Sequence, residues 1–360
     1  MKKIITVTKL TFSILLAASI SSNVKAQDVS DLIKSGPGDA TKLAQAYLMP
    51  AFKGFGFGMN SAWYNSAKAK NLGKFDLRIQ GTAAIVPSSD QFFRLGDLGL
   101  SSRTSFNSNA STPTLFGEDV TGAEITLKDN NGNNVSSFNM PNGLGFNMVP
   151  SPQIQLTVGV IKNTDISVRY SPKLGKSDDY GTLQVLGFGI KHEITKLLMP
   201  GKTEKIIPID IALAFGYNQL TYDKSIPIED QLDDKNSGSN LNQRVEGKLS
   251  GYTFDAIVSK KLAIFTPFAS IGYNTAKTEL GLLGTYVART GAPTVTDPNA
   301  TNDDKFTTFI DPVNIKQKDI AGLRGNVGFS LHLAFFRLYG SYSIGEYQAV
   351  TAGLGFGIGK

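Results

Sequence analysis

Strict alternation between large apolar residues and small or polar ones is the feature that most restricts the fold of this chain. In residues 209–218 the odd positions hold Ile, Ile, Leu, Phe and Tyr, whereas the even positions hold Asp, Ala, Ala, Gly and Asn. A β-strand points successive side chains to opposite faces, so this strand has one apolar face and one small, polar face. The outer face of a soluble sandwich is usually rich in charge. The small, polar face instead predicts the lining of a closed barrel whose outside contacts lipid.

The N-terminus has the features of a secretory signal peptide. Lys2 and Lys3 precede an apolar stretch at 10–20, and Val24-Lys25-Ala26 has the small-x-small pattern of a cleavage site. Residues 1–26 are therefore predicted to be removed. The apolar stretch is shorter than the roughly 20 residues that a membrane-spanning helix needs. The chain has no cysteine, which excludes disulfides and thiolate metal sites.

The net charge gives no reason to expect a nucleic-acid partner. The chain has 36 basic and 30 acidic residues, but four of its lysines lie in residues 1–26, which contain no acid. The mature chain thus has 32 basic against 30 acidic residues, a formal charge of +2. A mean hydropathy of −0.08 fits strands in which apolar residues alternate with polar ones. We predict export to the outer membrane of a Gram-negative bacterium, where the outer-membrane lipid is the first partner.

The mature chain is predicted to begin with a short helical segment at residues 27–52. A break at 35–38 is followed by Asp39, which is expected to cap a helix that ends before Pro50. The helix lies either at or in the periplasmic mouth of the barrel, or in a periplasmic tail. Residues 53–360 show no sign of a second domain and are predicted to form the barrel.

Period-two segments bounded by turn residues define the expected strands. They lie at residues 54–64, 74–86, 153–161, 165–171, 182–194, 206–222, 246–259, 263–277, 319–333, 338–344 and 348–358. Short turns at 162–164, 260–261 and 336–337 alternate with long polar loops at 223–245 and 279–318. Outer-membrane barrels have short periplasmic turns and long external loops, and this chain follows that layout.

The strand count depends on residues 87–150. If the N-terminus and the last strand both end on the periplasmic side, this region must contain an odd number of crossings. The candidates are 92–100, 123–128 and 135–140. One crossing gives about 12 strands and three give about 14. The predicted fold class is therefore all-β, a transmembrane antiparallel β-barrel of about 12–14 strands with a short N-terminal helical segment.

Two stretches of sequence carry a family resemblance. Residues 46–50 (Ala-Tyr-Leu-Met-Pro) and 54–65 (Gly-Phe-Gly-Phe-Gly-Met-Asn-Ser-Ala-Trp-Tyr-Asn), together with 140–153 and 168–172, resemble a Bacteroidetes-type family of outer-membrane barrels of unknown function. The resemblance covers most of the mature chain. Its members are similar in layout to the long-chain fatty acid transporter (FadL-like) barrels, in which a helical segment precedes the strands. Outer-membrane barrels typically close on a C-terminal aromatic residue, whereas this chain ends in Gly-Ile-Gly-Lys.

Charged residues on the faces assigned to the lumen are the candidate ligand-contacting residues. They are Asp76, Arg78, Asp165, Arg169, Asp210 and Asp255, with Lys248 and Arg324 on or near the same faces. One interpretation is a charged pathway that selects a solute. The other is a network of salt bridges that fills the barrel, and we favour it because an unpaired charge in a narrow barrel is costly.

His332 is the last candidate for the lumen, and it raises the question of catalysis. Ser330 lies two residues before it on the same strand face, and a serine beside a histidine is the arrangement of a nucleophile and its base. Residues two apart on one face lie about 7 Å apart at the backbone, which is too far for a bonded pair. No nucleophile elbow and no metal-ligand spacing is present. We therefore predict that the protein is not an enzyme and has no cofactor and no metal site.

The glycine-rich runs at 54–58 and 353–357 open no helix in this prediction, so they are not phosphate loops. Glycine on the inward face of a strand makes room for a close filling of the lumen. Aromatic residues near the predicted strand ends are expected to lie at the membrane interfaces. These are Trp63, Tyr64, Tyr170, Tyr217, Tyr222 and Tyr252.

Two functions remain open from the sequence. The first is a passive uptake channel for small hydrophobic or amphipathic solutes, which implies a small hydrophobic ligand. The alternative is a non-transporting barrel that acts as an anchor or partner for surface or secreted proteins. A protein partner would then bind the long external loops at 223–245 and 279–318, because binding residues concentrate in such loops.

Overall fold

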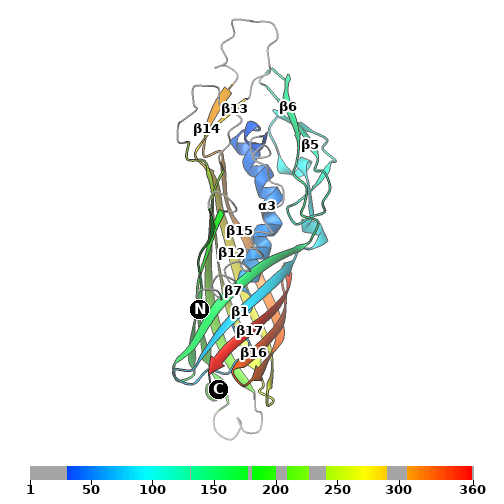
Figure 1. Cartoon of the computed structure of the whole chain (residues 1–360). Helices are drawn as coiled ribbons and strands as arrows, with labels where there is room; N and C mark the ends of the chain where they lie inside the picture. The colour runs from blue at the N-terminus through cyan, green and yellow to red at the C-terminus, as the bar shows by residue number, and fades with distance from the viewer. Residues whose placement is uncertain are drawn as a thin grey trace.

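Ten antiparallel strands close into a barrel in the computed structural model, which describes residues 31–129, 131–176, 181–199, 209–226, 241–289 and 306–358 (Figure 1). In chain order the strands are β1 (Phe75–Ile85), β7 (Met148–Ile161), β8 (Thr164–Lys176), β9 (Gly181–Glu193), β10 (Asp210–Ser225), β11 (Arg244–Ser259), β12 (Phe265–Leu283), β15 (Val313–Leu333), β16 (Phe336–Ile344) and β17 (Gln348–Ile358). The barrel closes at β1, where Leu77 lies opposite Leu156 of β7 and Phe356 of β17. Closure leaves no unpaired sheet edge.

The two ends of the barrel differ. Tight turns join β7 to β8, β11 to β12 and β15 to β16 at one end, which we call the turn end. The connection from β9 to β10, which includes α4 (Thr195–Leu198), also lies at the turn end. The opposite end, the loop end, carries the three longest connections, those from β1 to β7, from β10 to β11 and from β12 to β15 (Figure 1). Between β1 and β7 these form η1 (Ser88–Asp90), η2 (Leu95–Leu98) and two small sheets of β2 (Phe92–Arg94) with β4 (Ser111–Pro113), and of β3 (Thr104–Phe106), β5 (Glu124–Lys128) and β6 (Asn134–Asn139). Between β12 and β15 they form the hairpin of β13 (Thr285–Arg289) and β14 (Phe306–Ile310).

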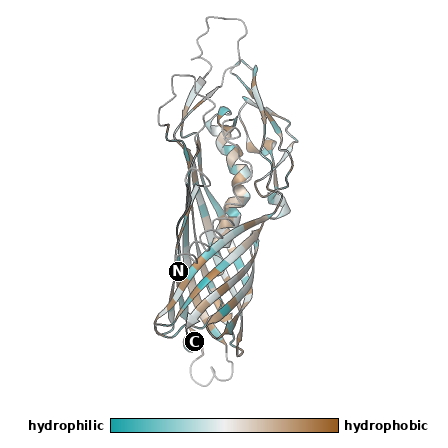
Figure 2. Ribbon diagram, in the orientation of Figure 1, coloured by the Kyte–Doolittle hydropathy of each residue, from teal (hydrophilic) through white to brown (hydrophobic). Residues whose placement is uncertain are grey.

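The outer face of the barrel is apolar. Figure 2 shows hydrophobic residues along the strands of the barrel wall. Large apolar side chains at alternate positions are exposed there, for example Leu186, Phe188 and Ile190 on β9. Burying such a surface in lipid is favourable, whereas a water-soluble protein rarely exposes so large an apolar patch. The predicted class of a membrane-spanning antiparallel barrel is therefore confirmed. Among the helices of the described ranges, none is long and apolar enough to cross a membrane.

A helix fills the lumen. α3 (Pro37–Asn60) runs from the loop end into the barrel and contacts β1, β7, β10, β11, β12 and β15 (Figure 1). Gly54 and Gly58 lie one helical turn apart and face β7, whereas Gly56 lies against Ala276 of β12. A Cβ atom at any of these glycines would overlap the barrel wall. The helix fits because it has no side chains where opposite walls approach it.

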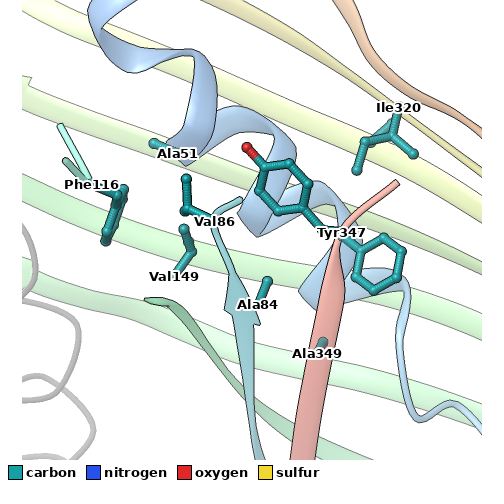
Figure 3. Close-up of a cluster of buried hydrophobic side chains, with 10 residues drawn as sticks. Ala51, Ala84, Val86, Phe116, Val149, Ile320, Tyr347 and Ala349 are labelled. Atoms are coloured by element: carbon teal, nitrogen blue, oxygen red, sulfur yellow. The ribbon is translucent and has the colours of Figure 1, made fainter. Parts of the chain in front are cut away.

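Apolar side chains surround α3 where it enters the barrel. Figure 3 shows this cluster, in which Ala51 and Phe57 of α3 meet residues of β1, β7, β12, β15 and β17 and of the loop end. Its other buried members are Ala84, Val86, Phe116, Val149, Ala276, Ile320, Tyr347 and Ala349. The side chains that hold α3 here are therefore packed as in a protein core.

Several predictions about the N-terminal part were wrong. Residues 54–64, predicted as the first strand, form the last turns of α3 and an irregular segment. The helix continues through Pro50, begins after Gly36 and lies in the lumen from the loop end, not at the periplasmic mouth. Asp39 does not cap it but accepts hydrogen bonds from Ser101 and Thr104. The predicted boundary between 27–52 and 53–360 therefore falls inside the helix, and the barrel begins at β1.

The predicted count of 12–14 strands was also wrong, because it counted residues 54–64 as a strand. Without a strand at 54–64, the chain reaches the loop end after β1 and returns with β7, so no crossing is needed between them. Segments 92–100, 123–128 and 135–140 contribute to the small sheets at the loop end instead. The other ten predicted strands correspond to the ten strands of the barrel. The predicted signal peptide, 1–26, lies outside the described residues.

Candidate functional site

The C-terminal end of α3 is held by an arginine of the barrel wall. Arg169 on β8 donates from Nη2 to the carbonyl of Ser61 at 2.9 Å and from Nη1 to the carbonyl of Met59. Its Nε donates to Gln155 at 2.8 Å, and its guanidinium stacks 3.8 Å above the ring of Trp63. Arg169 is only 1% exposed and forms no ion pair with a carboxylate of the described ranges. The partial negative charge of the helix end supplies part of the missing counter-charge.

Two further arginines bind the same stretch of backbone. Arg324 on β15 donates to the carbonyl of Asn60 at 2.7 Å and pairs with Asp255 at 3.0 Å. Arg78 on β1 donates to the carbonyl of Trp63 at 2.8 Å. Carbonyls at a helix end have no partner within the helix, and here the wall supplies the donors. Residues 37–74, which we call the luminal segment, are thus fixed to three different strands.

The structure places all seven predicted site residues inside the barrel. Arg169 and Asp255 bind near the end of α3, as described, and the other five line a cavity at the turn end. The remaining carboxylates are paired: Asp76 with Arg78 (3.3 Å) and Arg337 (3.2 Å), Asp165 with Lys191 (3.0 Å), and Asp210 with Lys68 (3.1 Å). The four aspartates are thus paired as the salt-bridge interpretation predicts, whereas Arg169 has no carboxylate partner within the described ranges. Direct contact of these residues with a ligand stays a prediction.

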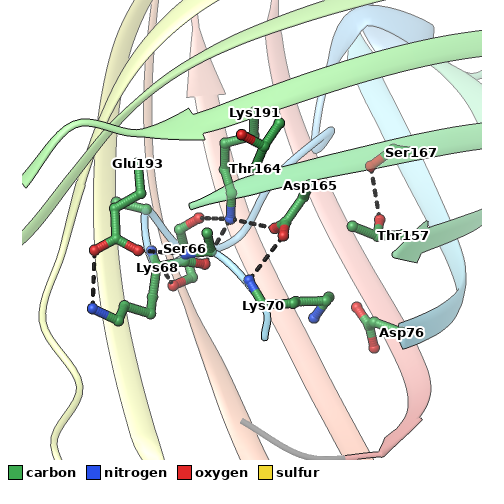
Figure 4. A network of polar contacts seen from close by, with 12 residues as sticks. Ser66, Lys68, Lys70, Asp76, Thr157, Thr164, Asp165, Ser167, Lys191 and Glu193 are labelled. Atoms are coloured by element: carbon green, nitrogen blue, oxygen red, sulfur yellow. Dashed lines mark hydrogen bonds and ion pairs between the residues drawn. The ribbon is translucent and has the colours of Figure 1, made fainter. Parts of the chain in front are cut away.

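The cavity at the turn end has a volume of about 530 Å³ and lies below the end of α3. Figure 4 shows its polar wall, in which residues 66–70 of the luminal segment meet β8 and β9. Lys191 donates to the carbonyls of Ser66 and Lys68, and the backbone amide of Lys70 donates to Asp165 at 2.8 Å. We call this space the turn-end cavity. Its lining is charged and polar, with aromatic rings from Tyr64 and Tyr339.

Positive charge dominates the turn-end cavity. Its lining includes six lysines and arginines against three aspartates. Lys70 is partly buried and makes no ion pair with a carboxylate within the described ranges. Burial lowers the pKa of Lys70 to about 8, because desolvation disfavours the charged amine; the nearby carboxylates of Asp76 and Asp165 oppose this shift, and the cations of Arg337 and Lys191 add to it. An anion in the cavity would therefore be stabilised by an amine that makes no direct ion pair of its own within the described ranges.

Four polar side chains of the same lining lack hydrogen-bond partners within the described residues. They are the hydroxyls of Tyr64, Thr266 and Ser330 and the Nδ1 atom of His332. Buried polar groups are nearly always bonded to protein, water or a ligand. These groups therefore suit a polar molecule or bound water. Because Ser330 and His332 do not bond each other, the structure contains no activated serine here.

Some residues were placed wrongly from sequence. Lys248 lies on the outer face of β11, because it is an odd number of residues from the inward Asp255. Trp63, Tyr64 and Tyr222 face the lumen, whereas Tyr170, Tyr217 and Tyr252 are exposed on the outside as predicted. Lys70 and Lys191 were missed altogether, although the parity of β9 indicates an inward Lys191. Within the described ranges, no group of three or more His, Asp or Glu is arranged to hold a metal ion.

A family model covers almost the whole chain. Residues 1–358 match the family described as Family of unknown function (DUF6588). The chain belongs to this family. The predicted membership in a barrel family of unknown function is thereby confirmed, whereas a search among curated proteins finds no match.

Solved structures similar to the chain are outer-membrane barrels of several kinds. They include the outer membrane protease OmpT from Escherichia coli (10% identity, 81% of this chain and 100% of that chain, TM-score 0.32). The translocator domain of autotransporter NalP from Neisseria meningitidis matches with 9% identity, 81% and 90% coverage and a TM-score of 0.25. The toluene transporter TodX of Pseudomonas putida matches with 8% identity, 87% and 97% coverage and a TM-score of 0.27.

Proposed function

We propose that the protein is an outer-membrane channel for passive uptake of small amphipathic solutes, and that the luminal segment closes it at rest. The observation that carries this proposal is the arrangement of the lumen. The luminal segment occupies the lumen, and directly below the end of α3 lies a cavity of about 530 Å³ whose described lining has an excess of basic residues and polar groups without hydrogen-bond partners. Passage then requires the luminal segment to move.

The chemistry of the turn-end cavity favours one kind of solute. Lys70 and the excess of basic residues favour an acidic group. The rings of Tyr64 and Tyr339 and the methyl groups of Ala69, Ala263 and Ala334 offer apolar contact beside it. A purely hydrophobic solute would have to desolvate the charged lining without replacing its hydrogen bonds, which is unfavourable. We therefore narrow the proposed substrate to small molecules with an apolar body and an acidic head.

A disulfide across the lumen tests whether the luminal segment must move. The hydroxyls of Ser66 and Ser259 lie 3.4 Å apart and join the luminal segment to β11. The chain has no cysteine, so Ser66→Cys with Ser259→Cys gives a single defined disulfide. We expect uptake of a short-chain fatty acid into proteoliposomes to fall at least about tenfold when this disulfide forms, and to return on reduction.

The control places a disulfide in the wall instead. Thr82 and Thr351 lie directly opposite each other on β1 and β17, with their hydroxyls 2.8 Å apart. Their double cysteine variant should transport equally in oxidised and reduced form. Equal uptake by the oxidised and reduced Ser66/Ser259 variant would show that the segment need not move. Absence of uptake in every form would contradict the proposed channel function.

If the solute has an acidic head, its affinity should change with pH through the charge of Lys70. Its pKa of about 8 in the folded protein means that the amine is charged at pH 7 and neutral at pH 9.5. We expect affinity for octanoate, followed by the fluorescence of Trp63, the single tryptophan, to fall about tenfold over this range. Because the pKa is lower than in the unfolded chain, stability should rise with pH from about 8 towards 10.5.

The matched variants are Lys70→Met and Lys74→Met. Lys74 lies four residues further on and does not line the cavity. Lys74→Met should keep both the affinity and its pH dependence, whereas Lys70→Met should bind weakly with a flat profile over this range. A wild-type affinity that does not change between pH 7 and 9.5 would contradict the role of Lys70.

A second candidate function, that of an anchor for surface or secreted proteins, rests on the loop end. The connection between β1 and β7 folds into two small sheets that pack on the outer half of α3, with Asp39 bound by Ser101 and Thr104. Such a folded extension offers a binding surface for a protein partner. Stable co-purification of one protein with the intact barrel, lost when the β5–β6 hairpin is shortened, would favour this function over transport.

A further inference from the structure

Four lysines lie together on the outer face of the barrel. Lys248 is on β11, Lys277 is on β12, and Lys316 and Lys318 are on β15; all four side chains are exposed. With Glu279 they border a surface hollow of about 580 Å³. We call these four residues the lysine patch.

The strand register brings like charges together in the lysine patch. Lys277 lies directly opposite Lys318, an arrangement that destabilises a strand pair unless a counter-charge is present. Glu279 lies opposite both Lys248 and Lys316 and is 3.5 Å from Lys277, so four cations share this one carboxylate.

The nearest other carboxylate on β11 does not balance this charge. Glu246 is bound by Arg244 at 2.7 Å. Among the described residues that border the hollow, the patch with Glu279 therefore keeps a formal charge of +3. This excess of positive charge points to an anionic partner.

The lysine patch lies where the apolar outer face ends. Tyr217 lies opposite Tyr252, and both are exposed on the outside, as expected of tyrosines at a membrane interface. Ser250, two residues from Tyr252 towards the loop end, lies opposite Lys277. The lysines thus begin one outward position beyond the tyrosines, at the level of the lipid headgroups.

We propose that the lysine patch binds the phosphate groups of a lipid headgroup in the outer leaflet of the outer membrane. Ammonium groups donate short, charge-assisted hydrogen bonds to phosphate oxygens, and several lysines around one hollow suit more than one phosphate. The acyl chains of the same lipid would lie along the apolar residues below the tyrosines. The loop end faces outward because long connections of such barrels are external. This inference depends on the barrel crossing the membrane and not on transport.

Native mass spectrometry of the full-length protein in a neutral detergent tests the proposal. The probe is bisphosphorylated lipid A, and the comparison is the same lipid without its phosphates. We expect the protein to retain the phosphorylated lipid preferentially, and Lys277→Gln with Lys318→Gln to reduce its affinity about tenfold. The control pair is Lys162→Gln with Lys260→Gln, two exposed lysines of the turn end with the same change in charge.

Four outcomes would overturn the proposal. The first three are equal retention of the two lipids, an unchanged affinity in the Lys277/Lys318 variant, and an equal loss in the control pair. Displacement of lipid A by the same concentration of inorganic phosphate would also overturn it, since the hollow would then be a site for a free anion. The four substituted lysines are exposed, so heat-modifiable gel mobility should report folded barrels throughout.

Discussion

Arg169→Met is expected to open the channel while leaving the barrel wall intact. The substitution leaves the carbonyl of Ser61 without its donor and removes one of two donors to the carbonyl of Met59, which Asn218 still binds. It also removes the cation that faces the end of α3. A buried carbonyl left without a partner costs about 1–3 kcal/mol, and the lost charge at a helix end costs up to about 2 kcal/mol. A shift of about 3 kcal/mol towards the open form raises its population by roughly two orders of magnitude. Single-channel recording should show frequent openings.

Arg169→Lys and Arg244→Met separate the causes of this effect. The lysine keeps the charge but lacks the planar fork that reaches two carbonyls, so an intermediate open probability is expected. Arg244 pairs with Glu246 at the loop end, and its replacement removes a partly exposed ion pair that contributes little. If the Arg169→Met channel stays as closed as wild type, this arginine does not hold the luminal segment.

The walls of the barrel were predictable from sequence because their signal is local. Each strand must present apolar residues to lipid and small or polar residues to the lumen, so alternation survives in every one of the ten. The same parity put Asp76 and Arg78 on one inward face, and pairing follows from the cost of burying a lone charge. Lys248 faces outward, contrary to the prediction, because it lies an odd number of residues from the inward Asp255 on β11.

The luminal segment was not predictable in the same way. Residues 54–58 alternate glycine with phenylalanine, which indicates a strand, and glycine disfavours a helix. In the barrel these residues are helical because tertiary packing overrides propensity: the walls accept a helix only where it lacks side chains. Trp63 and Lys70 lie beyond the helix in irregular chain, which has no period from which to infer a face. Which side chains of this irregular segment contact the wall depends on the diameter of the closed barrel.

Gly56→Leu is expected to expel α3 from the lumen, since the glycine lies where the helix meets the wall. A Cβ atom at Gly56 would lie 2.5 Å from the Cβ of Ala276, closer than such atoms approach. The helix cannot shift away, because Gly54 and Gly58 on its other face already lie against β7. Overpacking costs about 1–3 kcal/mol, and occasionally more, even where neighbours can adjust. We expect a folded barrel with lasting conductance and a protease-sensitive luminal segment.

Gly38→Leu is the matched control, because Gly38 lies in the first turn of the same helix and a Cβ atom there meets nothing within 4 Å. Replacing an unhindered helical glycine with leucine should stabilise α3 by up to about 1 kcal/mol, so this variant should stay closed. The two variants thus share one helix and one substitution and are predicted to have opposite effects. Gly56→Ala adds a single carbon, and its gain in helix propensity only partly offsets the overlap, so intermediate conductance is expected. Equal conductance of the Gly56→Leu and Gly38→Leu barrels would mean that the lumen is wider than the glycines imply.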